Sequence, residues 1–170
     1  MSNLRLLNET TVSSGVSSVD VTNVFSFDFD IYQIDISDMT SNANSYWYLR
    51  LINSSGSVLT TDYDNATLLI RSNDAFVEYK GTDKVSLWSN LNICYTDGNS
   101  GVFYIFNPFS SSNYTFMLGQ ETGYGYSSSR TNKNIGVYPN TTSCSGISIA
   151  NYSSTFTGGT IRTYGLRVDT

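Results

Sequence analysis

The stretch Phe156-Thr-Gly-Gly-Thr-Ile-Arg-Thr-Tyr-Gly-Leu-Arg-Val168 decides the fold that this sequence predicts. It reads as one β-strand, in which alternate residues lie on opposite faces. One face carries Ile161, Thr163 and Gly165, and the other carries Thr160, Arg162, Tyr164 and Leu166. Because no later strand is expected, this strand has to pair with a much earlier part of the chain. The candidate partners are residues 16–21 and 31–38.

The clearest alternation lies in residues 25–38. Phe25, Phe27 and Phe29 alternate with polar residues, and the phase then slips by one, so that Tyr32, Ile34 and Ile36 alternate instead. Strict alternation is typical of a strand with one buried face. The slip indicates either a β-bulge or a turn, and we favour a turn near residues 27–30 followed by a strand over residues 31–38.

The middle of the chain continues in short strand-like segments. The segment 46–52 places Trp47, Leu49 and Leu51 on one face, and the Ser- and Gly-rich residues 53–57 predict a hairpin loop that leads into a returning strand at 58–63. Residues 97–101 predict a turn that joins a strand at residues 93–96 to a strand at residues 102–106. The segment 102–106 is apolar at every position, which is typical of a strand covered on both faces. Further strands are expected at residues 10–13, 16–21, 66–71, 76–79, 85–88, 92–95, 114–118, 135–138 and 146–150.

Many short strands with frequent turns, and no helical periodicity, predict an all-β protein. The expected fold is an antiparallel β-sandwich, jelly-roll-like and without long helices, formed by residues 1–170 as one domain. The 13 tyrosines and nine phenylalanines indicate an aromatic core.

The charge of the chain excludes several classes of partner. Only 14% of the residues are charged and the net charge is −5, which argues against a phosphate-binding surface and so against nucleic acid. The longest apolar run is too short to span a bilayer, and residues 1–15 lack the features of a secretory signal. We therefore expect a complete small protein that is made in a cytoplasm and binds no membrane.

The residues available offer little catalytic chemistry. The sequence has no histidine, which removes the common nucleophile–base systems and the commonest zinc ligand, so we expect no enzyme, cofactor or metal. Paired carboxylates such as Asp28 with Asp30 are better explained as solvated strand residues than as glycosidase acids. Residues 62–65 could bind Ca²⁺ but read more simply as an acidic turn. Cys94 and Cys144 are either unrelated thiols or a disulfide.

Two tyrosine-rich segments, 107–114 and 124–130, have the Tyr, Ser, Gly and Asn composition of adaptable recognition loops. They predict a protein or glycan contact surface. The candidate residues are Phe109, Tyr114, Tyr124, Tyr126 and Arg130. The alternative is that these tyrosines belong to strands and pack the rim of the sandwich.

Four short motifs resemble those of small virion structural proteins of tailed bacteriophages, especially marine ones. They are Ser17-Ser-Val-Asp-Val-Thr-Asn-Val-Phe25, Asp30-Ile-Tyr-Gln-Ile-Asp-Ile-Ser-Asp38, Tyr48-Leu-Arg-Leu-Ile-Asn-Ser-Ser-Gly56 and the closing stretch Phe156-Thr-Gly-Gly-Thr-Ile-Arg-Thr-Tyr-Gly-Leu166. The resemblance covers about the first 65 residues and the last 13. The pair Asp20-Val21 departs from it, where a bulkier and less charged pair is expected.

The resemblance implies a β-sandwich on the outside of a virion, commonly a homotrimer, with no catalytic residues. The first interpretation is a capsid decoration (cement) protein that binds the major capsid protein or tail proteins. The alternative is a tail or head-fibre component that recognises host glycan through the tyrosine-rich loops.

Overall fold

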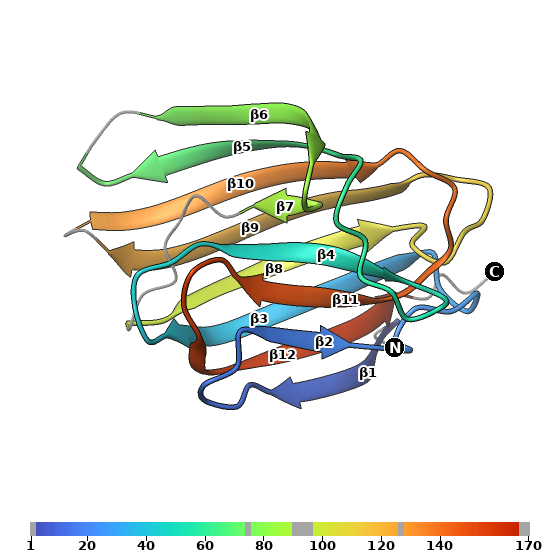
Figure 1. Cartoon of the computed structure of the whole chain (residues 1–170), viewed down its shortest axis with the longest axis horizontal. Helices are drawn as coiled ribbons and strands as arrows, with labels where there is room; N and C mark the ends of the chain where they lie inside the picture. Colours follow the sequence, from blue (N-terminus) through green and yellow to red (C-terminus); the bar gives the residue numbers. More distant parts are fainter. Residues whose placement is uncertain (1–2, 74–75, 90–96, 126–127, 167–170) are drawn as a thin grey trace.

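The computed structural model describes residues 3–73, 76–89, 97–125 and 128–166, and these residues form strands and no helix (Figure 1). The protein is an all-β sandwich of two antiparallel sheets, as the sequence predicted. The strands are β1 (Leu4–Thr11), β2 (Ser18–Val21), β3 (Ile31–Ser41), β4 (Trp47–Asn53), β5 (Tyr63–Arg71), β6 (Val77–Lys84), β7 (Trp88–Ser89), β8 (Asn99–Phe106), β9 (Thr115–Gly125), β10 (Ser128–Tyr138), β11 (Cys144–Asn151) and β12 (Phe156–Leu166).

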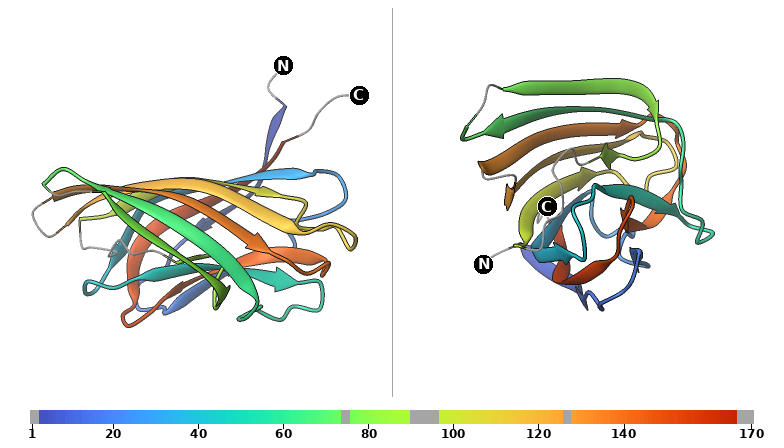
Figure 2. Two further views of the ribbon diagram at one scale, coloured as in Figure 1. Left: turned by 90° about the horizontal axis from the view of Figure 1, so that it is seen from above. Right: turned by 60° about the vertical axis from the view of Figure 1, so that its left-hand side comes forward.

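The strand order shows a jelly roll with two additions. The larger sheet has the order β1-β12-β3-β8-β9-β10-β5-β6, and the smaller has the order β2-β11-β4-β7. When the strand pairs β5–β6 and β9–β10 are set aside, β1-β12-β3-β8 and β2-β11-β4-β7 remain, and every connection between consecutive strands except β4 to β7 passes from one sheet to the other. That alternation is the jelly-roll topology. The added strands extend the larger sheet beyond β8, past the smaller sheet (Figure 2).

The closing strand β12 lies between β1 and β3. Ile161 is opposite Thr10 on one side and Ile36 on the other, and Gly165 is opposite Tyr32. Residues 31–38 are therefore confirmed as a partner. Of residues 16–21, only Val16 pairs with β12, in an isolated bridge to Phe156, because β1 occupies the rest of that edge and β2 pairs with β11 in the smaller sheet. The first strand begins at Leu4, well before the expected residues 10–13.

The core is aromatic where the two sheets meet. The indole of Trp47 on β4 meets that of Trp88 on β7 edge to face, with ring centroids 4.8 Å apart, and Trp88 lies 4.8 Å from the Phe103 ring on β8. Trp47, Leu49 and Leu51 are fully buried on one face of β4, as the alternation predicted. Each such side chain contributes about 1.5–3 kcal/mol to folding.

Two expectations for the middle of the chain were wrong. The chain runs back beside β4 only at Val58 and Leu59, where Leu59 N–H donates to Leu51 O at 2.9 Å, and then crosses to the larger sheet as β5. The hydroxyl of Tyr63 fixes this crossing, since it accepts from Leu51 N–H at 3.0 Å and donates to Leu59 O at 3.1 Å. In residues 102–106 only Phe103 and Ile105 are buried, so β8 is covered on one face and not on both.

Other boundaries are shifted. Strand β8 already begins at Asn99, inside the expected turn 97–101. The expected strand at 85–88 is reduced to the short β7. The expected segments 92–95 and 93–96 lie outside the described residues, and so does Cys94, while the thiol of Cys144 is buried in the core.

The expected turn before β3 is present and is built on the closing strand. Phe25 and Phe29 are buried on either side of Tyr32, with ring centroids 4.6 Å and 5.9 Å from its ring. The Phe29 ring lies directly against Gly165 of β12, where an added Cβ would come within 2.6 Å of the ring. Gly165 is therefore required because the aromatic ring occupies the space that a side chain would take.

We expect Gly165→Ala to lower the free energy of unfolding by about 1–3 kcal/mol, because the methyl group has to displace the Phe29 ring in a packed core. Urea denaturation followed by circular dichroism measures this change. Gly158→Ala on the same strand is the control, since its added Cβ meets only Thr40 Oγ1 at 3.4 Å, and it should change stability by no more than about 0.5 kcal/mol. Equal effects of the two substitutions would contradict the assigned role of Gly165.

Candidate docking surface

The outer face of the larger sheet, opposite the core, carries a continuous group of large apolar side chains. Antiparallel register places them in two rows across the strands. In one row Phe106 is opposite Phe116, which is opposite Val137. In the other, Tyr104 is opposite Leu118, which is opposite Ile135, and Ala66 follows on β5. We call these seven residues the apolar band.

Much of the apolar band is open to solvent. Phe116, Leu118 and Ile135 expose 46%, 51% and 57% of their surface. A surface hollow of about 660 Å³ lies between the two rows and the edge strand β6. The band residues other than Tyr104 line this apolar hollow, together with Asp64, Lys80, Thr82 and backbone of the neighbouring strands. A contiguous exposed apolar surface of this kind marks a site of interaction.

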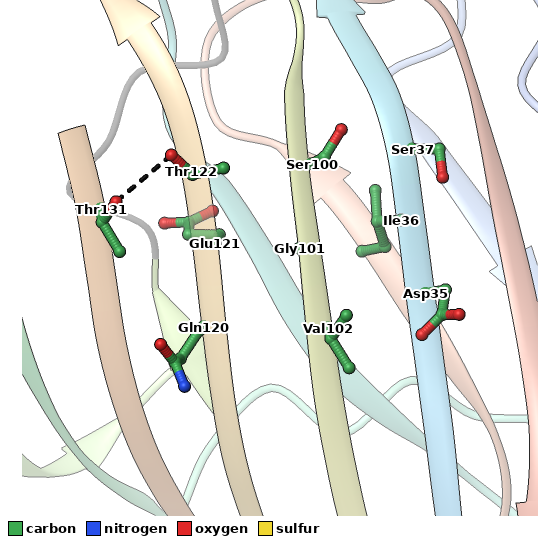
Figure 3. Close-up of a pocket in the computed structure, with 10 residues that line it drawn as sticks. All are labelled: Asp35, Ile36, Ser37, Ser100, Gly101, Val102, Gln120, Glu121, Thr122 and Thr131. Carbon is green, nitrogen blue, oxygen red and sulfur yellow. Dashed lines mark hydrogen bonds between the residues drawn. The ribbon is translucent and has the colours of Figure 1, made fainter. Parts of the chain in front are cut away.

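Farther along the same strands, the outer face becomes polar. An open groove of about 520 Å³ crosses β3, β8, β9 and β10 (Figure 3). Its side-chain oxygens and nitrogens come from Asp35, Ser37, Ser100, Gln120, Thr122 and Thr131. Thr131 Oγ1 donates to Thr122 Oγ1 at 3.2 Å, and Gln33 Nε2 donates to Asp35 Oδ1 at 2.8 Å. We call this surface the polar groove.

The inner face of β9 and β10 is polar as well. Glu121 is buried, and Asn132 on the neighbouring strand donates from Nδ2 to Glu121 Oε1. Burial raises the pKa of the Glu121 carboxyl well above its usual range, because the charged form loses its hydration, while the Asn132 hydrogen bond opposes the shift. One row away, Thr67 Oγ1 donates to Asn134 Oδ1 at 2.6 Å. These two strands therefore bury the polar side chains of Glu121, Asn132 and Asn134, whereas the apolar side chains of Leu118 and Ile135 are open to solvent.

The structure places the predicted contact residues at two separate ends of β9. Phe109 and Tyr114 lie in the connection from β8 to β9, whereas Tyr124 and Arg130 lie at the opposite end, roughly 30 Å away for a strand of this length. Tyr114 and Tyr124 are exposed, and Phe109 packs partly against the core. Tyr126 lies outside the described residues. The contact role of these residues stays a prediction.

Arg130 is only 7% exposed and sits on the inner face of β10, where its Nε donates to Ser128 Oγ at 3.2 Å. The described residues of the segment 124–130, whose composition was read as that of a recognition loop, belong to strands β9 and β10. The sequence did signal the apolar band, because Phe116 with Leu118 and Ile135 with Val137 place large apolar residues on faces that the core does not use. That signal was missed because 114–118 and 135–138 were predicted as strands without an assignment of their faces.

Residues that could hold a metal do not cluster: within the ranges described above, no group of three or more Asp, Glu, Cys or His side chains has a suitable arrangement. The same part of the chain contains no helix long and apolar enough to cross a membrane.

No protein-family model matches this sequence, and no curated protein matches it. Among solved structures, the galectin LEC-6 of Caenorhabditis elegans is similar at 9% identity and a TM-score of 0.29, over 95% of this chain and 96% of the galectin. A structure of the infectious bursal disease virus Gx strain is similar at 9% identity and a TM-score of 0.15, over 98% of this chain and 39% of the viral chain. These values are too low to assign a family or a function.

We expect the pH dependence of stability to change in Glu121→Gln. A carboxyl whose pKa is raised on folding stabilises most below its unfolded pKa of about 4.3, and this stability is lost as the pH rises toward the folded pKa. Glutamine keeps an acceptor for Asn132 but does not titrate, so the variant should lose less stability than the parent between about pH 5 and about pH 8. Urea unfolding at both pH values measures the difference.

The matched control is Glu78→Gln, on the exposed surface of β6. It also removes one negative charge, so that a difference between the two variants reports on the buried position of Glu121. An unchanged pH dependence in Glu121→Gln would show that the carboxyl does not titrate differently in the folded state.

Proposed function

We propose that this protein is a structural component of a bacteriophage virion, acting as a capsid decoration (cement) protein on the outer surface of the particle. The observation that carries this proposal is the apolar band. Removing apolar area from water is worth about 25 cal/mol per Å², so a face with several half-exposed aromatic and aliphatic side chains gains stability when a protein covers it.

The sequence resemblance supports this assignment. The jelly-roll fold alone implies no activity. The phage-like motifs lie on strands β2, β3, β4 and β12, so the resemblance concerns the jelly-roll scaffold. The proposed partners are the major capsid protein or tail proteins, with the protein itself as a homo-oligomer, a trimer in the family that it resembles.

The copy number per particle tests the decoration role. Quantitative mass spectrometry of purified virions should find hundreds of copies if the protein decorates the capsid. A few dozen copies or fewer would place it in the tail and overturn the decoration role.

We expect Leu118→Glu to lower incorporation into particles by about tenfold or more, equivalent to about 1.4 kcal/mol, because it puts a charge into the apolar band. Leu118 is half-exposed, so the variant should remain folded by circular dichroism. Gln120→Glu, two residues along the same face of β9, is the matched control and should incorporate normally. Normal incorporation of Leu118→Glu would show that the band does not attach the protein to the virion.

The polar groove favours a second candidate function, recognition of a host glycan by a tail or head-fibre component. Its hydroxyls, together with Asp35 and Gln120, can exchange hydrogen bonds with sugar hydroxyls, and Tyr104 lies in the row beside it. Loss of glycan-array binding in Gln120→Ala would support this function and locate the binding site in the groove. Loss of binding in Tyr124→Ala alone would locate the binding site at the end of β9. If the parent protein binds no glycan, this second function is rejected.

A further inference from the structure

We infer that the apolar hollow receives a second copy of this chain, whose exposed Phe27 inserts into it. The inference rests on the proposed assembly role of the apolar band and names one partner for it. Three observations support it: an exposed aromatic side chain on a hydrogen-bonded turn, an apolar hollow that this side chain does not line, and charged residues of opposite sign beside the two.

Phe27 projects from the turn between β2 and β3 and is 86% exposed, although Phe25 and Phe29 on either side of it are buried. We call residues 26–30 the Phe27 turn. The Tyr32 hydroxyl fixes the backbone at the start of this turn, because it accepts from Ser26 N–H and donates to Ser26 O, both at 2.8 Å. Asp28 N–H donates to Ser26 Oγ at 3.2 Å. A turn whose backbone is already held in place loses little conformational entropy on binding.

The apolar hollow offers what an aromatic ring requires. Its walls are formed by Phe116, Leu118 and Ile135, and its volume of about 660 Å³ lies within the range of pockets that enclose ligands. Residues of this kind surround a buried aromatic anchor at the centre of protein interfaces.

The Phe27 turn of the same molecule borders a different surface. Phe27 lines a small depression with Asn107, Phe109 and Ser110, whereas the hollow is lined by Phe106 of β8 and by residues of β9, β10, β5 and β6. The two surfaces adjoin at residues 106 and 107 but share no residue, and Phe27 is exposed and does not line the hollow of its own chain, so we assign the insertion to a second copy. Contacts between unlike surfaces form a closed ring when the rotation between copies permits it.

Charge favours this pairing and its orientation. Phe27 is followed by Asp28 and Asp30, both exposed, while Lys80 lines the hollow and the other two lysines of the sequence, Lys84 and Lys133, lie on β6 and β10, two of the strands that form it. Asp64 also lines the hollow, but its Oδ1 accepts from the Asp83 amide at 3.3 Å. Because Glu78 and Asp83 share β6 with two lysines, the apolar contact supplies most of the affinity and the charges orient the partner.

Size-exclusion chromatography with light scattering tests the contact in solution. The parent protein should be larger than a monomer, and both Phe27→Ser and Ile135→Glu should be monomers with unchanged circular dichroism. An equimolar mixture of the two variants should form a 1:1 dimer, because one supplies an intact hollow and the other an intact Phe27. Phe76→Ser, which alters another exposed phenylalanine, is the control and should assemble like the parent.

A monomeric parent protein at millimolar concentration, or two variants that do not associate when mixed, would overturn the inference. The proposed function fails by a different measurement. If the parent is monomeric but Leu118→Glu is lost from virions, the hollow binds another virion protein and the structural role stands. If the parent self-associates but is absent from virions, the contact between copies stands and the virion role is rejected.

Discussion

Strand β12 forms backbone hydrogen bonds along both of its edges, with β1 on one side and β3 on the other. Its register turns Ile161 and Thr163 into the core and puts Gly165 under the ring of Phe29. Phe29 and Tyr32 in turn hold the Phe27 turn in place. The stretch that closes the sandwich therefore also shapes the turn that carries Phe27, the most exposed aromatic side chain among the described residues.

Part of the added strand pair β9–β10 inverts the usual pattern of a sheet. Along β9, Glu121 is buried whereas Phe116 and Leu118 are open to solvent. A strand that met only its own core and water would be expected to show the reverse. The inversion explains why the outer face of these strands, rather than any loop, is the best candidate for a partner surface.

Alternation in the sequence predicted which residues face the core wherever a strand has one buried face, as in residues 31–38, in β4 and in 161–165. Alternation could not show whether a second apolar face is covered by the chain itself or by a partner. Both faces of residues 102–106 were therefore predicted to be buried within the chain, although Tyr104 lies on a face that is open to solvent. The contact residues from Phe109 to Arg130 were chosen by local composition, and the length of β9 places them at its two opposite ends.

The late position of β12 also sets an order of assembly. The ion pair between Glu9 and Arg162 joins residues 153 positions apart, so closing this part of the sheet is costly in chain entropy, whereas β9 and β10 are neighbours and can pair early. Until residues 156–166 are available, β1 and β3 both present open strand edges that other chains could join. The same strand that completes the sandwich thus ends the period in which the nascent chain is most prone to aggregation.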